Sequence, residues 1–433
     1  MIRIAPFGRL LAVTAAASLA LAACSGGGED AAEPAAGASS APASSAPAEA
    51  QGDGVLTIGT LLPSTGSLAF LGPPEFAGVR LAVNEINEAG GVLGKEVVLI
   101  DTDSGDTSTN IASQSVDKLL QQKVDAIIGA ASSSVSLTVI DKITGAGVIQ
   151  MSPANTSDQF TTYNDNGLYF RTAPPDVLQG RVLGDLILSD GHDTVGILAL
   201  QDAYGTGLAE NTQKTIEAGG GQVVEKVIYD PKAAEYSADV AKIKAANPKA
   251  IALIGFDETK KIVPELVKQG LTVDKVAWYF VDGNLSNYGT GPDGFPKGTL
   301  KGAKGTQPGA AAPEEFRKRM LTVDPKLKDW NYGPESYDAA NLIALAAELA
   351  KSDAPKDIAA KLQEVSSGGE KCHDFKSCKA LLDQGKDFDY DGVSGPIEFN
   401  AAGDPAEATI GIYQYDENNE VKNIDYKTGK IDG

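Results

Sequence analysis

The sequence is poor in the side chains that most enzymes use for catalysis. It contains only two histidines, His192 and His373, and three cysteines among 433 residues. Neither histidine stands beside a plausible nucleophile, and the sequence shows no clear metal-ligand cluster or cofactor fingerprint. Ser133 lacks the Gly-x-Ser-x-Gly setting of a hydrolase, and no Walker lysine accompanies the glycine-rich stretch 289–294. We therefore expect no enzymatic activity and no cofactor.

Positive charge and long apolar runs are also scarce. The 37 Lys and Arg residues are outnumbered by 58 Asp and Glu residues, which gives a formal net charge of −21. This surplus of negative charge argues against nucleic acid or an anionic membrane surface as a partner, and it keeps copies of the chain dispersed. We expect a monomer. Beyond the N-terminal region, no apolar run reaches the length of about 20 residues that a membrane helix needs.

The N-terminus carries the features of an export signal. Two arginines precede an apolar stretch at 10–21, which is too short to span a bilayer comfortably. The stretch ends in Leu21-Ala22-Ala23-Cys24, which resembles the lipobox of bacterial lipoproteins. The resemblance implies a signal peptide at 1–23 and an acylated Cys24, which would anchor the protein to the cell membrane on its extracytoplasmic side. A plain secretory signal with a chance cysteine, or a short anchor helix, is the alternative.

The segment at 24–53 is predicted to be a disordered tether. From Ser25 to Ala50 it consists almost entirely of Ala, Gly, Ser, Pro and Glu, without a large apolar side chain. Such a segment buries too little surface to offset its loss of conformational entropy on folding. A flexible chain of this length spans roughly 30 Å, so a folded body would stand clear of the membrane.

The two remaining cysteines, Cys372 and Cys378, are an even pair in an exported protein. This favours a disulfide that closes the short loop between them. The neighbouring His373 raises zinc as an alternative. A structural zinc site needs four ligands, however, and the sequence offers no second Cys or His cluster.

From residue 55 onward, short apolar runs alternate with amphipathic segments. Because this alternation is typical of parallel sheets covered by helices, we expect an α/β protein. The expected strands are 55–62, 97–100, 126–129, 148–151, 195–200, 223–228, 251–255 and 276–280, followed by 396–399, 408–415 and 421–426 in a β-rich tail. The expected helices include 75–88, 108–122, 135–144, 177–189, 204–218 and 335–350.

The alternation starts afresh near residue 177, which indicates two lobes of similar size. A chain of roughly 380 residues is too long for one ordinary core and suits two domains. We predict two Rossmann-like lobes with parallel sheets, joined by hinge strands. The N-terminal lobe is expected at 54–173 with 307–403, and the C-terminal lobe at 174–306 with 404–433.

Three loops that follow predicted strands carry polar side chains. They are 130–134, 152–157 and 281–284. In open α/β sheets, ligands bind at the carboxyl ends of strands, where such loops meet. The first two loops offer hydroxyls and amides at helix N-termini, which suit a carboxylate. The third offers the carboxylate of Asp282, which suits an ammonium group.

Together with other segments, these loops resemble the branched-chain amino-acid-binding family of ABC importer solute-binding proteins, which have the type I periplasmic-binding fold. The resemblance runs from about Leu56 to Tyr415, and it rests on an ordered set whose single members are not diagnostic. The set comprises Pro63-Ser64-Thr65-Gly66, the segments 75–87 and 90–94, the loops at Ser132-Ser133-Ser134 and Pro153-Ala154-Asn155-Thr156, Phe170-Arg171-Thr172, and 202–207.

The resemblance implies a role for individual positions. Ser133 and Thr156 would hold the α-carboxylate and α-amino groups of an amino acid, and Asp282 would face the ammonium. Backbone groups of Ala154 would help Ser133 and Thr156, and Tyr204 would close over the ligand. Three residues would line the side-chain pocket: Phe70, Phe256 and Tyr337. Ser132 and Asn155, from the same two loops, complete the set of candidates. Many relatives have a larger acidic residue in place of Asp282, and several have a tyrosine in place of Phe70, which leaves the side-chain preference open.

Several of these candidates also have a purely structural interpretation. Residues 132–134 could cap a helix, Thr156 could be a loop residue, Asp282 could belong to a turn, and Tyr204 and Phe256 could be interior packing.

The resemblance implies a solute-binding protein that traps a small zwitterion between its lobes and delivers it to a permease and an ATPase on other chains. The alternatives are a sensing lipoprotein that reports to a receptor, and a binder of an amide, a urea-like compound or an aromatic acid.

Overall fold

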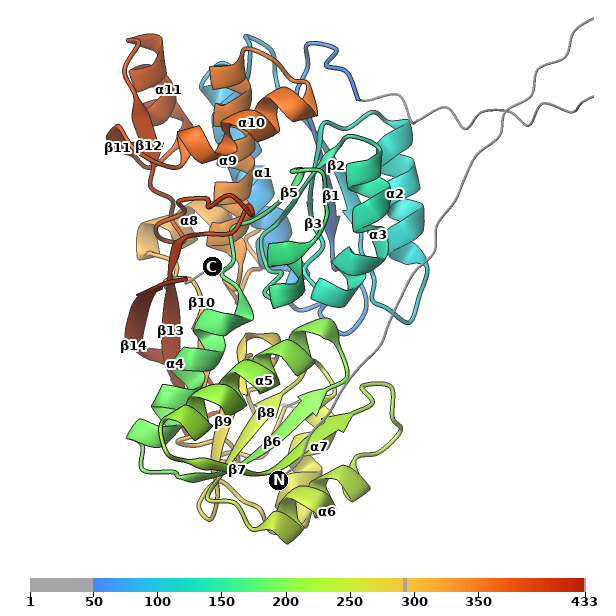
Figure 1. The fold of residues 1–433 in the computed structure, drawn as a ribbon, viewed down its shortest axis with the longest axis vertical. Helices are drawn as coiled ribbons and strands as arrows, with labels where there is room; N and C mark the ends of the chain where they lie inside the picture. Colours follow the sequence, from blue (N-terminus) through green and yellow to red (C-terminus); the bar gives the residue numbers. More distant parts are fainter. Residues whose placement is uncertain (1–49, 291–293, 432–433) are drawn as a thin grey trace, which may run out of the picture. The chain divides into compact units, whose positions relative to one another are not determined.

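The computed structural model describes residues 50–290 and 294–431, which belong to one folded unit. The predicted signal peptide, Cys24 and the tether up to residue 49 lie outside the described residues. Two sheets with their covering helices form the framework of this unit (Figure 1). We call the five-stranded sheet with its helices the first lobe, and the seven-stranded sheet with its helices the second lobe.

The first lobe is built on a parallel sheet. Its strand order is β2 (Val98–Asp103), β1 (Thr57–Leu62), β3 (Ala126–Gly129), β4 (Ile149–Ser152) and β5 (Tyr169–Arg171). Alternate side chains of the strands point to opposite faces. Those of Ile58 and Ile128 pack with helix α1 (Gly72–Glu88), whereas those of Leu61 and Ile127 pack with α2 (Ile111–Gln121) and α3 (Ser133–Gly145).

Helices from much later in the chain complete the first lobe. Helix α9 (Gly333–Ala350) packs along α1, and α8 (Glu314–Val323), α10 (Pro355–Val365) and α11 (Phe375–Asp383) surround the pair (Figure 1). The close approach of α1 to α9 depends on Gly78, because a β-carbon there would lie 2.3 Å from the carbonyl oxygen of Gly333. A short sheet of β11 (Glu370–Cys372) and β12 (Phe388–Tyr390) stands beside α11.

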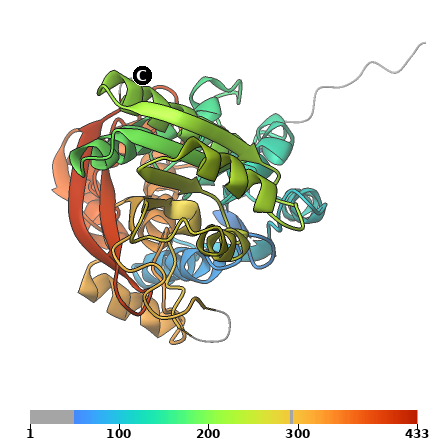
Figure 2. The same ribbon diagram turned by 90° about the horizontal axis from the view of Figure 1, so that it is seen from below.

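The second lobe has the larger sheet. Its order is β14 (Val421–Lys430), β13 (Glu407–Tyr415), β10 (Lys304–Pro308), β9 (Ala277–Val281), β8 (Ala250–Ile254), β6 (Thr194–Leu200) and β7 (Gln222–Tyr229). The strands from β10 to β7 are parallel, whereas β13 runs antiparallel to β10 and to β14. The helices of this lobe are α4 (Asp176–Ser189), α5 (Ala203–Ala218), α6 (Ser237–Ala246) and α7 (Thr259–Lys268). Figure 2 shows the green α4 beside the red β13–β14 hairpin, which comes more than 200 residues later.

The chain passes between the lobes three times. The first passage follows β5, the second follows β10, and the third precedes β13. The guanidinium of Arg171, at the end of β5, forms a fully buried ion pair with Asp404 (2.6 Å), which lies just before β13. The first and third connections are therefore tied to each other.

The predicted fold class, two α/β lobes with mainly parallel sheets, is confirmed, but several local expectations differ. The three-residue strands β5, β11 and β12 were not predicted. The predicted strand at 396–399 is absent, and only an isolated bridge joins Phe399 to Pro405. Its alternating apolar side chains, Ile397 and Phe399, are buried in the first lobe, but its backbone does not run beside a partner strand. Strand β10 was not expected, because its sequence Lys-Gly-Thr-Gln-Pro has no apolar run.

The structure joins Cys372 and Cys378 in a disulfide, with their α-carbons 5.2 Å apart, between β11 and α11. Over the described ranges we find no group of three or more Cys, His, Asp and Glu side chains placed to hold a metal ion. None of the helices in these ranges has the length and apolar character required to cross a membrane.

Candidate ligand-binding site

The first lobe contributes the start of helix α3 to the site. The buried strand β3 ends at Gly129, and Ser132 caps the helix by accepting a hydrogen bond from the backbone N–H of Val135 (3.3 Å). Ser133, which is also buried, follows in the first turn. The free N–H groups and the dipole at a helix start favour an anionic group. The helix-capping interpretation of this loop is therefore correct for Ser132, and it is compatible with ligand binding.

The loop after β4 is fixed against the loop after β3. The hydroxyl of Ser152 donates to the carbonyl of Ala130 (2.7 Å), and the side-chain amide of Asn155 donates to the carbonyls of Ala130 (2.9 Å) and Ala131 (2.8 Å). These buried bonds position Ala154 and Thr156 beside the start of α3. The backbone N–H of Ser157 also bonds to the hydroxyl of Ser133 (3.3 Å).

The second lobe contributes aromatic rings and a carboxylate. Asp202 caps helix α5 through the backbone N–H of Tyr204 (2.9 Å), which places the tyrosine in the first turn. The ring of Tyr204 stacks on that of Phe256, with centroids 5.6 Å apart. Asp282 directly follows β9, at the carboxyl end of the parallel sheet.

Asp282 is the electrostatic centre of the site. Its Oδ1 accepts hydrogen bonds from the amide of Gln179 (2.7 Å) and the hydroxyl of Tyr204 (2.8 Å), and its Oδ2 accepts one from the hydroxyl of Tyr332 (2.7 Å). Only 5% of the residue is exposed. Burial raises the pKa of the carboxyl, and the bonds from Tyr332, Gln179 and Tyr204 oppose this rise.

A second buried acid lies close by. Asp176 opens helix α4, and its backbone N–H donates to the carbonyl of Thr156 (2.6 Å). Burial, followed by the repulsion of Asp158, raises the pKa of the Asp176 carboxyl well above its ordinary value. Repulsion between Asp176 and Asp282 also contributes, which means that a cation near them would relieve an unfavourable interaction.

These elements surround one small cavity between the lobes. It is lined by Leu68, Leu71, Ala131, Ser132, Ser133, Ala154, Thr156, Tyr204, Phe256, Asp282, Gly283 and Tyr332. Seven of these are sequence-predicted candidates: Ser132, Ser133, Ala154, Thr156, Tyr204, Phe256 and Asp282. The volume of the cavity is about 10 Å³, which is room for about one water molecule.

Three predicted candidates do not line this cavity. Asn155 is buried beside the cavity, and its side-chain amide donates the hydrogen bonds that join the loops after β3 and β4. Phe70 is half-buried and packs against the core of the second lobe. Tyr337 lies within helix α9, where its hydroxyl donates to Glu85 (2.6 Å) and accepts a bond from Arg319 (2.8 Å).

Sequence reasoning missed Tyr332, which lines the cavity in place of Tyr337. A usable signal was present, because the Gly333-Pro334 pair marks the start of α9 and therefore puts Tyr332 in the loop before the helix. Leu68 and Leu71, from the loop before α1, were also missed. They precede Gly72 in a stretch that lacks any polar motif.

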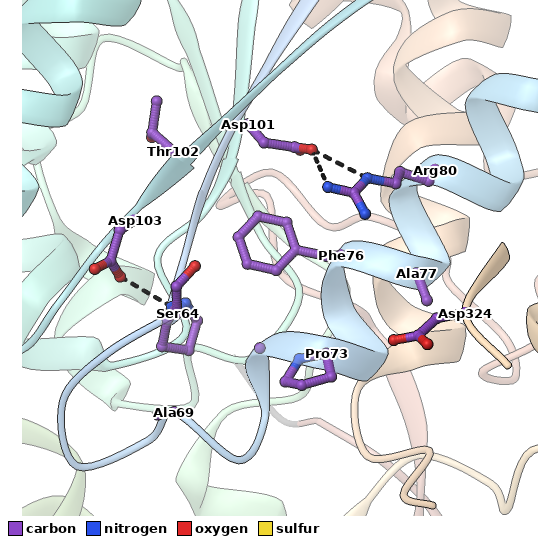
Figure 3. A pocket seen from close by; sticks show the side chains of 12 residues that line it. Ser64, Ala69, Pro73, Phe76, Ala77, Arg80, Asp101, Thr102, Asp103 and Asp324 are labelled. Atoms are coloured by element: carbon purple, nitrogen blue, oxygen red, sulfur yellow. Dashed lines mark hydrogen bonds and ion pairs between the residues drawn. The ribbon is translucent and has the colours of Figure 1, made fainter. Parts of the chain in front are cut away.

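A larger pocket of about 430 Å³ opens on the first lobe, between β2 and α1 (Figure 3). Arg80 and Asp101 form an ion pair there, and Asp103 accepts a bond from the backbone N–H of Ser64 (2.9 Å). Among the described residues that line it, Arg80 is the only cation and is already paired with Asp101, and the whole lining comes from the first lobe, including Asp324 at the end of α8. A ligand held by both lobes therefore fits the smaller cavity at Asp282 better.

Comparisons with known proteins agree with this architecture. A family model described as "Periplasmic binding protein" matches residues 55–420. A chemotactic signal transduction system substrate-binding protein from Halobacterium salinarum is 26% identical over 364 residues, which cover 81% of this chain and 84% of the relative. Leu/Ile/Val-binding protein homolog 1 from Brucella suis is 25% identical over 380 residues, which cover 83% and 90%.

A solved structure shares the fold. It is a solute-binding protein of an ABC transporter from R. palustris in complex with benzoate, with a TM-score of 0.69, 19% identity, and coverage of 87% of this chain and 98% of that one. The family match over most of the chain, the two α/β lobes and the cavity between them lead to one conclusion: the chain belongs to the periplasmic binding protein family.

Proposed function

We propose that the cavity at Asp282 binds the head group of a small zwitterion, most readily a branched-chain or related amino acid. The observation that carries the proposal is the arrangement of donors and acceptors on opposite sides of one cavity. Ser133 and Thr156, at the start of α3 and in the loop beside it, suit a carboxylate, and Asp282 of the second lobe suits an ammonium group.

The energetics support an affinity in the micromolar range. Hydrogen bonds to charged groups contribute about 1.5–3 kcal/mol each. Three or four of them, together with contact to Leu68, Leu71 and Phe256, approach the roughly −8 kcal/mol that a micromolar dissociation constant requires. In the ligand complex, the ammonium would replace at least one of the tyrosine hydroxyls that now bond to Asp282.

A cavity of about 10 Å³ is too small for an amino acid, so binding requires the lobes to separate. Hydrogen bonds between the lobes hold the site closed, and the bond from the Tyr332 hydroxyl to Asp282 (2.7 Å) is one of them. The backbone N–H of Ala203 donates to the hydroxyl of Ser134 (3.0 Å), and the hydroxyl of Ser157 donates to the carbonyl of Ala203 (3.2 Å). We propose that the lobes, at 54–173 with 307–403 and at 174–306 with 404–433, open and close about their three connections.

We further propose that the protein delivers its ligand to an ABC permease and ATPase on other chains. Acylation of Cys24 would hold it on the extracytoplasmic side of the cell membrane, near that permease. Mass spectrometry of the mature N-terminus tests this part separately. The expected product begins with an acylated Cys24, and an unacylated cysteine behind an uncut leader would refute the lipid anchor.

Two alternatives have specific support. The R. palustris structure was solved with benzoate, so an aromatic acid is one. An aromatic acid brings no ammonium, however, and its carboxylate would meet the carboxyl group of Asp282. The Halobacterium salinarum relative is named for chemotactic signalling, which makes ligand sensing the other. Uptake of ligand by vesicles that carry the matching permease supports transport, whereas no protein-dependent uptake favours sensing.

A thermal-shift screen tests the ligand class. The purified protein is mixed with single amino acids, amides, urea-like compounds and aromatic acids. We expect the melting temperature to rise with at least one amino acid, and to rise much less in the Ser133→Ala variant. No shift with any amino acid, together with a shift for an aromatic acid, would refute the zwitterion proposal.

A further inference from the structure

A second pocket lies where the chain crosses between the lobes for the second time. Its volume is about 380 Å³, within the range of about 300–1,000 Å³ that is usual for small-molecule sites. We call it the crossover pocket, and the residues that define it are Pro308, Arg317, Lys328, Trp330, Tyr332 and Tyr413. They come from β10, α8, the loop before α9, and β13, so both lobes line it.

Unpaired positive charge gathers at this pocket. Neither the guanidinium of Arg317 nor the ammonium of Lys328 has a hydrogen-bonded or ion-paired partner in the described part of the chain, and both side chains are exposed. A third cation, Lys422, pairs with Asp416 (3.0 Å), which does not line the pocket. In a chain with a net charge of −21, two free cations at one pocket attract an anion locally.

The acidic residues of the pocket oppose this charge only weakly. Burial raises the pKa of the Asp329 carboxyl, which disfavours its ionised form, although hydrogen bonds from the backbone N–H groups of Asn331 (3.0 Å) and Trp330 (2.7 Å) oppose this rise. Glu335 is buried, and burial raises the pKa of its carboxyl well above its ordinary value, which disfavours its ionised form.

The rest of the lining is aromatic and apolar. The half-buried rings of Trp330 and Tyr413 and the buried ring of Tyr332 line the pocket together with Pro308 and Pro334. A guanidinium forms paired hydrogen bonds with carboxylates and with sulfonate-like groups, and flat rings stack on indole. We propose that the crossover pocket is a second ligand site, which binds a small organic anion with an aromatic or apolar body, its charged group held by Arg317 and Lys328.

Tyr332 connects this site to the first one. It lines both the crossover pocket and the cavity at Asp282, and its hydroxyl bonds to Asp282. An anion in the crossover pocket therefore changes the affinity of the cavity for its own ligand. This coupling rests on the proposed amino-acid function, whereas the anion site does not.

Tryptophan fluorescence tests the site directly. The protein has two tryptophans, Trp330 at the pocket and Trp278 buried in the second lobe, so the Trp278→Phe variant leaves one reporter. The probe is 8-anilino-1-naphthalenesulfonate, an aromatic anion. We expect saturable quenching of the Trp330 emission, weakened by added NaCl because screening acts on exposed charges. If the Trp278→Phe variant does not fold, the quenching is measured on the unmodified protein, in which the emission of Trp278 is a constant background.

Matched variants show which side chains bind the probe. The Arg317→Gln/Lys328→Gln double variant is expected to bind the probe at least tenfold more weakly. Lys326→Gln, an exposed change in the same loop that does not line the pocket, is expected to bind as the parent does. Equal affinity in the double variant, or the absence of saturable quenching, would overturn the site.

A variant in the cavity at Asp282 shows at which of the two sites the probe binds. Ser133→Ala is expected to leave probe binding unchanged, and loss of the probe in this variant would place it at Asp282 and overturn the second site. The coupling is tested by measuring amino-acid affinity with and without the probe. An unchanged amino-acid affinity at saturating probe would refute the coupling alone, and failure of all amino acids to bind would refute only the proposed function.

Discussion

The hydroxyl of Tyr332 donates a 2.7 Å hydrogen bond to Oδ2 of Asp282 and thereby joins the first lobe to the second. Tyr332 immediately precedes α9, which packs on α1, and Asp282 follows β9 of the other sheet. The same carboxylate is the proposed partner of the ligand's ammonium. Asp282 therefore takes part in the contact between the lobes and is also the proposed binding partner of the ligand.

Removing this hydroxyl is expected to favour the open form of the ligand-free protein. A hydrogen bond to a charged group is worth about 1.5–3 kcal/mol, so Tyr332→Phe should shift the equilibrium toward open by about 10- to 150-fold. Small-angle X-ray scattering measures this as a larger radius of gyration. Tyr337→Phe is the matched control, because the Tyr337 hydroxyl bonds to Glu85 within the first lobe. Equal radii in the two variants would contradict the prediction.

The pH dependence of binding separates the two ligand classes. An ammonium binds the ionised carboxyl of Asp282, and a proton competes with it. Because burial raises the pKa of this carboxyl, protonation begins at higher pH than in a free aspartate. Amino-acid affinity should therefore fall as the pH is lowered from about 8 toward 4, whereas benzoate affinity should rise while benzoate stays ionised. Calorimetric titrations across this range measure both slopes, and an amino-acid affinity that rises on acidification would contradict the role of Asp282.

The buried pair of Arg171 and Asp404 is expected to be essential for stability. The guanidinium of Arg171 also donates to the carbonyls of Asn155 (3.3 Å) and Ser157 (2.8 Å), on either side of Thr156. Removing one partner of a buried pair leaves an uncompensated charge, so Asp404→Asn should lower the free energy of unfolding by about 3–5 kcal/mol.

Urea denaturation measures this loss, and an exposed ion pair provides the control. Asp193 and Lys249 are 2.7 Å apart, with both side chains more than half exposed. Asp193→Asn should therefore change the free energy of unfolding far less than Asp404→Asn does, because exposed ion pairs add little to stability. Similar losses in the two variants would show that the pair of Arg171 and Asp404 has no special role.

The fold could be predicted where apolar runs mark buried strands. All five residues of β8 are buried between helices, and its sequence is continuously apolar. Strand β10 gave no such signal, although it lies between β9 and β13. Its residues Lys304–Pro308 are polar or small, and its place in the sheet is set by pairing with strands distant in sequence. Tertiary pairing thus outweighed local propensity there.

The candidate site could be predicted where it consists of loops after strands. Ser133, Thr156 and Asp282 each follow a recognisable apolar strand, and the carboxyl ends of those strands face one cavity. Tyr332 could not be placed in the same way. The Gly333-Pro334 pair marks it as the residue before α9, but it reaches the cavity only because α9 packs back on the first lobe, and local sequence does not predict that long-range packing.

Isothermal titration calorimetry of the protein and its Asp282→Asn variant with L-leucine, L-isoleucine and L-valine measures whether Asp282 binds the ammonium of an amino acid. At least one of these amino acids is expected to bind with micromolar or tighter affinity. The variant, which keeps the shape of the side chain but loses its charge, is expected to bind at least tenfold more weakly. Absence of binding by the protein, or equal affinity in the variant, would contradict a role of Asp282 in binding an amino acid.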